Sequence, residues 1–501
     1  MLTTRHFMLI RLLSIAMTVI WSASRTNAQD IKEHWYVLEM MGQRAGWMMT
    51  RQSDSADVIE TETKSVISVA QGANAIKVEV SSSFVETPDG KAVSMASTRK
   101  FGAMDVRQDY QFVEDGVIVK TSQSGRVSES KVAKPEGEWL TPNGANLFFL
   151  KRLEANAETI VLRSIDAQSG LSPVNTKYFN FTDATMEHAG ATIDVKWFDV
   201  EVSSTPGVKS RQCVDSNGNM IRNETVMGGM KVITRLSTRE EALGELAAPE
   251  IMMKSFVRPD KAIVNPRSAV RAVYRVSAPD ELPDFPITGS QQFERIDAKS
   301  AIVTVSNDTQ RSLAPFLAED TAANAMIDCK DPEITSAMKR ALEGREDSSI
   351  PERAETLRRF AFHFIRKQLG VGFATASEVA RTRTGDCSEH GVYLAALLRA
   401  NGIPARVAAG LIYADSFAGS RDIFGYHMWT QAWIEVDGIG RWVDLDATLP
   451  EAIPFDATHI TLAVMSLKDD DLTTSMAAMS TTLGTLKIEI NDIEGTTTRE
   501  Q

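Results

Sequence analysis

Over most of the first 245 residues, hydrophobic and polar side chains alternate in short segments. IKVEVSSSFVE (76–86) and TIDVKWFDVEVS (192–203) both show this period of two, which places successive side chains on opposite faces of a strand and does not fit a helix. Turn sequences such as PDGK (88–91) separate the segments, as they do in β-hairpins. We therefore predict a β-rich accessory domain over residues 29–245.

This β-rich region carries no recognisable chemistry. It has no clustered cysteines and histidines, no glycine-rich phosphate loop and no acid pair at a telling spacing. We expect its aromatic residues to lie in the core rather than to form a ligand platform. A proline-bearing stretch follows, and we predict a smaller β segment or linker over residues 246–330, which could equally be the first part of the next domain.

The first 28 residues have the pattern of an export signal. Arg5 and Arg11 precede an apolar stretch (12–21), and a run of small residues ends at Ala28, where a signal peptidase would cleave. The alternative is an uncleaved membrane anchor, but the apolar stretch is short for a bilayer. We predict a signal peptide over residues 1–28 and a periplasmic or secreted product with no integral membrane segment after cleavage.

The charge balance excludes one class of partner. The formal net charge is -12 at pH 7 over 501 residues, so no basic excess is available to neutralise phosphates. We expect no nucleic acid partner.

Helical signals begin at residue 331. DPEITSAMKRALEG (331–344) starts with a capping aspartate and a proline, and SIPERAETLRRFAFHFIRKQLG (349–370) starts with a capping box. A third, apolar helix follows Asp386 and stops at Asn401-Gly402. Three strands come next, at 405–413, 426–436 and 441–448, and the loop 414–425 between the first two could act as a lid. We predict an α+β catalytic core over 331–465, followed by a tail over 466–501 with a last strand at 484–492.

Cys387 stands at the start of this third helix, in TRTGDCSEHGVYLAALLRANGIPAR (382–406). The unpaired N–H groups and the dipole of a helix start stabilise a thiolate, and the same N–H groups can hold an oxyanion. If Cys213 and Cys329 pair, Cys387 remains a free thiol in an oxidising compartment, where an unused thiol is a liability. Cys387 is therefore a candidate nucleophile, although a small buried residue at a helix start would look the same.

A thiol nucleophile needs a base and a third group that orients the base. His390 lies one turn along the same helix, where it would obstruct the substrate. His427 instead begins the strand 426–436, on the face that mixes polar groups with tryptophans and so suits a cleft wall. We expect His363 to be a satisfied structural histidine, and His459 to be structural or at the surface.

Two acids could orient the base. In RWVDLDAT (441–448), Asp444 and Asp446 share one face, and an antiparallel neighbour can bring either carboxylate beside His427. The alternative is a pair of solvated acids on a strand edge.

These segments together resemble the catalytic core of the transglutaminase-like superfamily. The pattern is a Gly-x-Cys helix ending in Gly-Ile-Pro-x-Arg (385–406), a His-x-Trp strand (427–429) and a strand ending Leu-Asp-x-Thr (445–448), all present here in order. The resemblance covers residues 331–465, about a quarter of the chain.

The resemblance implies a papain-like α+β fold and thiol chemistry on amides. It makes Cys387 the nucleophile, His427 the general base and acid, and Asp446 the orienting carboxylate, because Asp446 rather than Asp444 occupies the Leu-Asp-x-Thr position. Animal transglutaminases use a tryptophan upstream of the cysteine, but none lies between Trp197 and Cys387. Calcium dependence has no support either, so simpler bacterial members are the nearer comparison.

The predicted function is an exported thiol enzyme that acts on peptide or glutamine-type amide bonds through a thioester. Water would make it a protease or amidase, and an amine would make it a transamidase. Its partners would be protein or peptide substrates, cell-wall peptides among them, and we expect neither a cofactor nor a metal. One alternative is a catalytically silent binding or scaffold protein with the same fold. Another is a metal site of Cys387, His390 and His427, which lacks a fourth ligand at familiar spacing.

Overall fold

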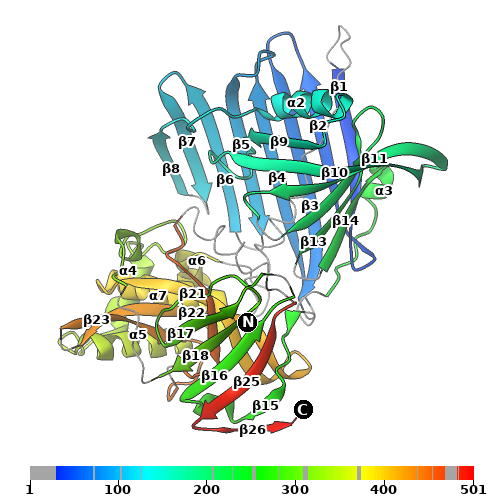
Figure 1. Ribbon diagram of the computed structural model, residues 1–501. Coiled ribbons are helices and arrows are strands. Elements are labelled where there is room, and N and C mark those ends of the chain that lie inside the picture. The colour runs from blue at the N-terminus through cyan, green and yellow to red at the C-terminus, as the bar shows by residue number, and fades with distance from the viewer. Residues whose placement is uncertain are drawn as a thin grey trace. The chain divides into compact units, whose positions relative to one another are not determined.

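Figure 1 shows the computed structural model of the chain, which describes residues 30–500 with several gaps. The gaps are residues 72–73, 102–103, 124–125, 206–207, 228–229, 251–254, 280, 308–313, 369–373, 437, 454, 469–481 and 483. Two compact units form, and the main boundary between them falls at Pro249 and Glu250. The signal peptide predicted over residues 1–28 lies outside the described residues.

The N-terminal unit is built on one sheet of fourteen strands, in the order β8-β7-β6-β5-β4-β3-β2-β1-β14-β13-β12-β11-β10-β9. Sequence neighbours pair within β1 to β8 and within β9 to β14, and β1 also pairs with β14, so two meanders are joined side by side. Pairs such as β1 with β2 and β10 with β11 are antiparallel, which confirms the β-rich character predicted from the period-two alternation. The strands are β1 (Asp30–Met40), β2 (Gln43–Asp54), β3 (Ile59–Gln71), β4 (Asn74–Glu86), β5 (Ala92–Phe101), β6 (Met104–Val113), β7 (Gly116–Gln123), β8 (Arg126–Val132), β9 (Thr159–Ser164), β10 (Val174–His188), β11 (Ala191–Val202), β12 (Lys209–Val214), β13 (Met220–Met227) and β14 (Met230–Ser237).

Helix α2 (Pro142–Glu154) lies against this sheet (Figure 1). Its residue Phe149 is fully buried and meets Tyr178 edge-on, with ring centroids 4.6 Å apart, and Phe198 at 5.4 Å. Aromatic pairs in such tilted arrangements add to the stabilisation from buried area. These three aromatic residues therefore lie in the core. A short helix, α3 (Arg239–Ala242), follows the last strand.

The described part of the C-terminal unit holds two four-stranded sheets. One has the order β17-β18-β16-β25 and the other β23-β22-β21-β24. The side-chain amide of Gln291 joins them, because it donates to the carbonyl of Thr461 at 2.8 Å and accepts from the Thr461 N–H at 2.7 Å. The strands are β15 (Lys261–Val264), β16 (Arg271–Ser277), β17 (Gln291–Asp297), β18 (Ser300–Ser306), β19 (Arg366–Lys367), β20 (Thr384–Gly385), β21 (Ala405–Phe417), β22 (Ser420–Val436), β23 (Ile439–Leu445), β24 (His459–Met465), β25 (Lys487–Glu494) and β26 (Thr497–Glu500).

Four α-helices accompany these sheets in the described residues, namely α4 (Pro332–Ala341), α5 (Ile350–Phe364), α6 (Ala376–Thr382) and α7 (Cys387–Ala400), and two short 3-10 helices lie at Pro266–Ser268 and Ala318–Asp320. Helix α7 is the central one, since every residue from Cys387 to Arg399 is buried, and it contacts α4, α5 and α6 as well as β21 and β22. The chain is thus a mixed α+β protein in which a large β-rich unit precedes a unit that contains helices. None of the helices described has the length and hydrophobicity that a membrane crossing requires.

The structure departs from the sequence analysis at three places. The helix expected to run to residue 370 ends at Phe364, because the next residues turn extended and β19 pairs in parallel with β20. Helix α6 was missed, although Thr375 and Glu378 form a capping box that marks its start. The loop 414–425 is mostly strand, since the β21–β22 hairpin extends to a two-residue turn. The segment is therefore a paired hairpin where the sequence predicted a loop.

Arg358 of α5 holds the loop that follows β23 in place through hydrogen bonds to its backbone. Its side chain is fully buried and donates to the backbone carbonyls of Asp446 at 3.1 Å, Leu449 at 3.2 Å and Glu451 at 2.8 Å. Its charge is balanced by Glu355, whose carboxylate lies 2.7 Å from Nε. Buried donors and carbonyls are costly when unpaired, so this one guanidinium fixes the path of the loop.

We predict that Arg358→Met destabilises the C-terminal unit by about 3 kcal/mol, because the carbonyls of Asp446, Leu449 and Glu451 lose their donor, and the first two are buried. The neighbouring Arg359 pairs with the same Glu355 at 2.7 Å but is half exposed, so Arg359→Met is the matched control and should leave stability unchanged. Chemical denaturation of the two variants measures the difference. Equal losses in both would show that the carbonyl contacts of Arg358 contribute nothing.

Candidate active site

Cys387 is the first residue of α7, and contacts made by the residues before and after it fix the path of the chain. Before it, Thr384–Gly385 pairs in parallel with Arg366–Lys367. After it, the Asp386 side chain caps the helix by accepting from the Ser388 N–H at 3.2 Å. The sequence predicted this cap. The cap orients the first turn of α7, and Cys387 lies at the positive, N-terminal end of the helix dipole.

Glu389 completes the cap from inside the protein. Its fully buried carboxylate accepts from the backbone N–H groups of Asp386 at 2.9 Å and Ala374 at 2.8 Å. Gly385 is required here, because a Cβ at that position would lie 2.2 Å from the Cβ of Glu389. Burial and the nearby Asp386 raise the pKa of Glu389 to about 8.

Strand β22 runs beside the start of α7. The Thr430 hydroxyl donates to the carbonyl of Gly391 at 2.9 Å and ties the strand to the helix. Burial and Asp386 raise the pKa of the Cys387 thiol, and a hydrogen bond from the backbone of Met428 works against that rise. Met428 follows His427 directly, so Cys387 lies against the segment of β22 that carries this histidine.

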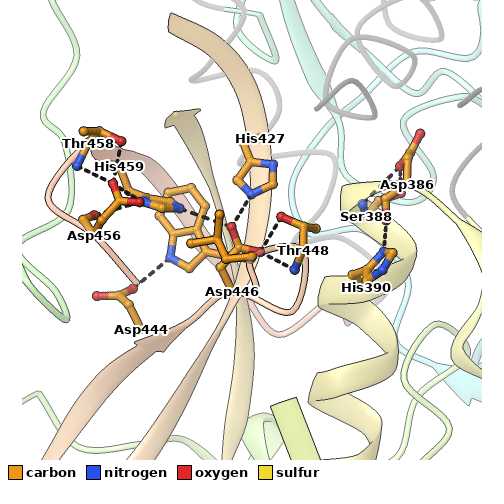
Figure 2. Close-up of polar contacts among 12 residues, drawn as sticks. Asp386, Ser388, His390, His427, Asp444, Asp446, Thr448, Asp456, Thr458 and His459 are labelled. Atoms are coloured by element: carbon orange, nitrogen blue, oxygen red, sulfur yellow. Dashed lines mark hydrogen bonds and ion pairs between the residues drawn. The ribbon is translucent and has the colours of Figure 1, made fainter. Parts of the chain in front are cut away.

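His427 and Asp446 are hydrogen-bonded to each other. The Nε2–H of His427 donates to Oδ2 of Asp446 at 2.7 Å, and both side chains are buried (Figure 2). The other ring nitrogen, Nδ1, has no hydrogen-bond partner among the described residues. Burial outweighs the attraction of Asp446 and lowers the pKa of His427 to about 4, so the imidazole is neutral at pH 7 with Nδ1 unprotonated. An imidazole in this state can accept a proton at Nδ1.

Asp446 lies one residue beyond β23, and not within the strand as predicted. Its Oδ1 accepts from both the N–H and the hydroxyl of Thr448 at 2.7 Å, and this tight turn ends the strand. Its Oδ2 is thereby left for His427 and for His459, whose Nε2 lies 3.2 Å away. Burial alone would raise the pKa of Asp446, but the two histidines hold it well below its usual value.

Asp444 has a different environment. Its carboxylate accepts from Trp429 Nε1 and from Gln431 Nε2 at 2.8 Å each, and from the Ser290 N–H at 2.8 Å. It therefore joins β23 to β22 and to the turn before β17, and it faces away from His427 in Figure 2. The alternative that Asp444 and Asp446 are solvated edge acids is wrong, because both are buried.

His459 was expected to be structural or at the surface, and it is fully buried at this cluster. Its Nδ1 lies 2.9 Å from the backbone carbonyl of Asp456 and 3.5 Å from the Asp456 carboxylate. Asp456 Oδ1 also binds the N–H and hydroxyl of Thr458, while Oδ2 pairs with Arg267 at 2.5 Å. One signal could have found this: DAT occurs at 446–448 and again at 456–458, and both copies fold into the same turn.

Comparison with known proteins places part of the chain in a family. Residues 337–447 match the model of the transglutaminase-like superfamily. The chain carries a transglutaminase-like core. No curated protein matches the chain at a significant level.

Solved structures give weaker likenesses. A candidate cysteine protease from Cytophaga hutchinsonii is 10% identical over 49% of this chain and 92% of its own, with a TM-score of 0.27. A candidate protease from Parabacteroides distasonis is 14% identical over 56% of this chain and 70% of its own, with a TM-score of 0.18. A β-barrel-like protein of unknown function from Brucella abortus is 14% identical over 42% of this chain and 98% of its own, with a TM-score of 0.33.

The two remaining histidines of the C-terminal unit, His390 and His363, bond to groups other than His427 and Asp446. His390 is buried in α7 and its Nδ1 lies 2.6 Å from the carbonyl of Asp386, which keeps the ring on its own helix (Figure 2). His363 is exposed on α5 and pairs with Glu451 at 2.7 Å. The metal site considered for Cys387, His390 and His427 does not form among the described residues, where the one cluster of three possible ligands combines His427 and Asp446 with His459. Both histidines already bond Asp446, and we assign no metal to these three groups.

The pKa values of the two histidines that share Asp446 are shifted in opposite directions, so the two residues should make stability depend on pH in opposite ways. Burial works to lower the pKa of His459, but Asp456 and Asp446 outweigh it and raise that pKa to about 9, above the unfolded value near 6.5. A raised pKa contributes stability that is complete below about pH 6.5 and is lost as pH rises through 9. The lowered pKa of His427 contributes stability that is present above pH 6.5 and is lost toward pH 4.

We therefore predict that the stability advantage of the wild type over His459→Gln shrinks between pH 6.5 and 9, by up to about 1.4 kcal/mol per pH unit. Chemical denaturation of both proteins at pH 6, 7.5 and 9 measures the gap. His363→Gln removes an exposed histidine of the same unit and should show no such trend. A gap that stays constant with pH would mean that His459 is not charged in the folded protein.

Proposed function

We propose that the transglutaminase-like core is a thiol enzyme that acts on peptide or glutamine-type amide carbonyls. Cys387 is its nucleophile, His427 its general base and acid, and Asp446 the residue that orients His427. The observation that carries the proposal is the state of His427. Its Nε2–H is bound to Asp446 at 2.7 Å, and its Nδ1 has no partner among the described residues. A general base needs this combination of a fixed tautomer and an open nitrogen.

In the first half-reaction, Nδ1 of His427 takes the thiol proton while the sulfur of Cys387 forms a bond to the carbonyl carbon. The tetrahedral intermediate collapses when His427 returns the proton to the leaving amine, and the C–N bond breaks to give a thioester. Asp446 stabilises the imidazolium that exists between the two proton transfers. The N–H groups at the start of α7 are the candidate oxyanion donors, because the helix dipole favours negative charge there.

In the second half-reaction the thioester is resolved by a second nucleophile that His427 deprotonates. Water gives a free acid and a protease or amidase reaction, whereas an amine gives a new amide and a transamidase reaction. We favour hydrolysis of peptides. An exported, periplasmic or secreted location after removal of residues 1–28 would bring the site to cell-wall and other extracytoplasmic peptides. Within this proposal residues 331–465 form the catalytic core and residues 29–245 an accessory domain.

We predict that iodoacetamide alkylates Cys387 at a nearly constant rate between pH 5 and 8. His427 has a pKa of about 4 and so remains a neutral base throughout that range. In His427→Ala the thiol has no base, and the rate should fall about tenfold for each pH unit below neutrality, as for an ordinary thiol. Intact-protein mass spectrometry follows the reaction, and Cys387→Ala shows how much labelling comes from Cys213 and Cys329. A wild-type rate that falls with pH and does not respond to His427→Ala would remove the enzyme proposal.

We predict that the purified protein modifies members of a peptide library and that Cys387→Ala leaves the library unchanged. Mass spectrometry separates three products: cleaved peptides, peptides shifted by about one dalton through deamidation, and peptides that have gained an added amine. Cys329→Ala is the matched control, because it removes another buried thiol of the same unit. An unchanged library, together with ordinary alkylation of Cys387, would favour a binding or scaffold protein.

A further inference from the structure

His459 is held at both ring nitrogens by groups that accept hydrogen bonds. Its Nδ1 faces the backbone carbonyl of Asp456 at 2.9 Å, and its Nε2 faces the carboxylate of Asp446 at 3.2 Å. A carbonyl cannot donate, so Nδ1 must carry a hydrogen. Asp446 already accepts from His427 and twice from Thr448, which identifies it as an ionised carboxylate and places a second hydrogen on Nε2. The contacts therefore describe an imidazolium.

The charges around His459 support this state. Two carboxylates face it, Asp446 on one side and Asp456 on the other, and the second is itself paired with Arg267 at 2.5 Å. The neutral ring of His427 lies 5.8 Å away, centroid to centroid. Burial opposes the charge, but the two carboxylates prevail and raise the pKa of His459 to about 9.

Aromatic rings fix the orientation of His459. Phe455 stacks on it at a centroid distance of 4.3 Å and an interplanar angle of 30°, and Trp429 meets it edge-on at 5.1 Å. An imidazolium against aromatic faces gains electrostatic attraction as well as packing. The ring therefore has one orientation, in which Nε2 points at Asp446 (Figure 2).

We propose that His459 is a positioning residue for the reaction. It is a buried imidazolium that donates to the Asp446 carboxylate. The hydrogen bonds run from His427 through Asp446 and His459 to Asp456. This inference rests on the proposed function, because it gives His459 its role through His427. The Asp446 Oδ2 atom accepts a hydrogen bond from each histidine, so both rings fix the position of the same oxygen. His459 also places a positive charge near His427, which lowers the pKa of that ring and helps to keep it neutral.

Two substitutions separate the hydrogen bond of His459 from its charge. His459→Gln can keep a donor toward Asp446 and removes the charge, whereas His459→Phe keeps a ring against Phe455 and removes both. The rate of Cys387 alkylation by iodoacetamide between pH 3.5 and 8, measured on the full chain, reports the state of His427 without a known substrate. His363→Gln is the control.

The alkylation rate should be constant near neutral pH (the plateau) and fall in acid, with a midpoint at the pH where it is half the plateau rate. In His459→Gln we expect this midpoint to rise by on the order of one pH unit above the wild-type value, with the plateau rate unchanged. In His459→Phe we expect the plateau rate to fall at least about tenfold, because Asp446 loses a charged donor and His427 loses its fixed orientation. A merely structural role for His459 would change the melting temperature without moving the midpoint. Should His459→Phe fail to fold, the midpoint in His459→Gln decides alone.

The possible failures can be told apart. A wild-type rate that falls steadily with pH would overturn the proposed function, and this inference with it. A flat wild-type rate that requires His427, with an unmoved midpoint in His459→Gln, would overturn the inference and leave the proposed function standing.

Discussion

The carboxylate of Asp446 is fully buried, and a buried charge is tolerated only where donors surround it. Four donors do so: the N–H and hydroxyl of Thr448 on one oxygen, and the rings of His427 and His459 on the other. The rest of the site follows from this arrangement. The carboxylate selects the tautomer of His427, and it requires the turn that ends β23.

The frame around this carboxylate uses backbone groups more than side-chain pairs. Arg358 donates to the carbonyl of Asp446 and to two further carbonyls of the same loop. Asp444, two residues before Asp446, ties β23 to β22. On the other side, the capping box of α7 and the close packing at Gly385 set the position of Cys387. Helix and sheet are each rigid, so residues far apart in sequence reach one site without a long loop to hold them there.

Local patterns in the sequence predicted the parts of the fold that local physics decides. A capping aspartate places Cys387 at a helix start, and the period of two places His427 on a strand, because each feature depends on residues within a few positions. The features that were missed depend on distant partners. Helix α5 ends early because β19 pairs with β20, and the hairpin 414–425 stays paired because β21 and β22 extend together. The burial of His459 depends on Trp429 and Asp446, which lie on other segments, and the repeated Asp-Ala-Thr turn is its local signal in the sequence. The roles of Cys387, His427 and Asp446 remain a proposal.

The repeated Asp-x-Thr turn has a further consequence for how such a chain can vary. Asp446 and Asp456 are ten positions apart, each turn is locked by its own threonine, and His459 follows the second turn at a fixed distance. The intervening segment is held at one end by Arg358 and at the other by Arg267. An insertion or deletion between the two turns would change the separation of the two histidines that share Asp446. Loops usually tolerate changes of length well, but this one acts as a spacer, and in relatives with the same cluster we expect its length to vary less than its composition.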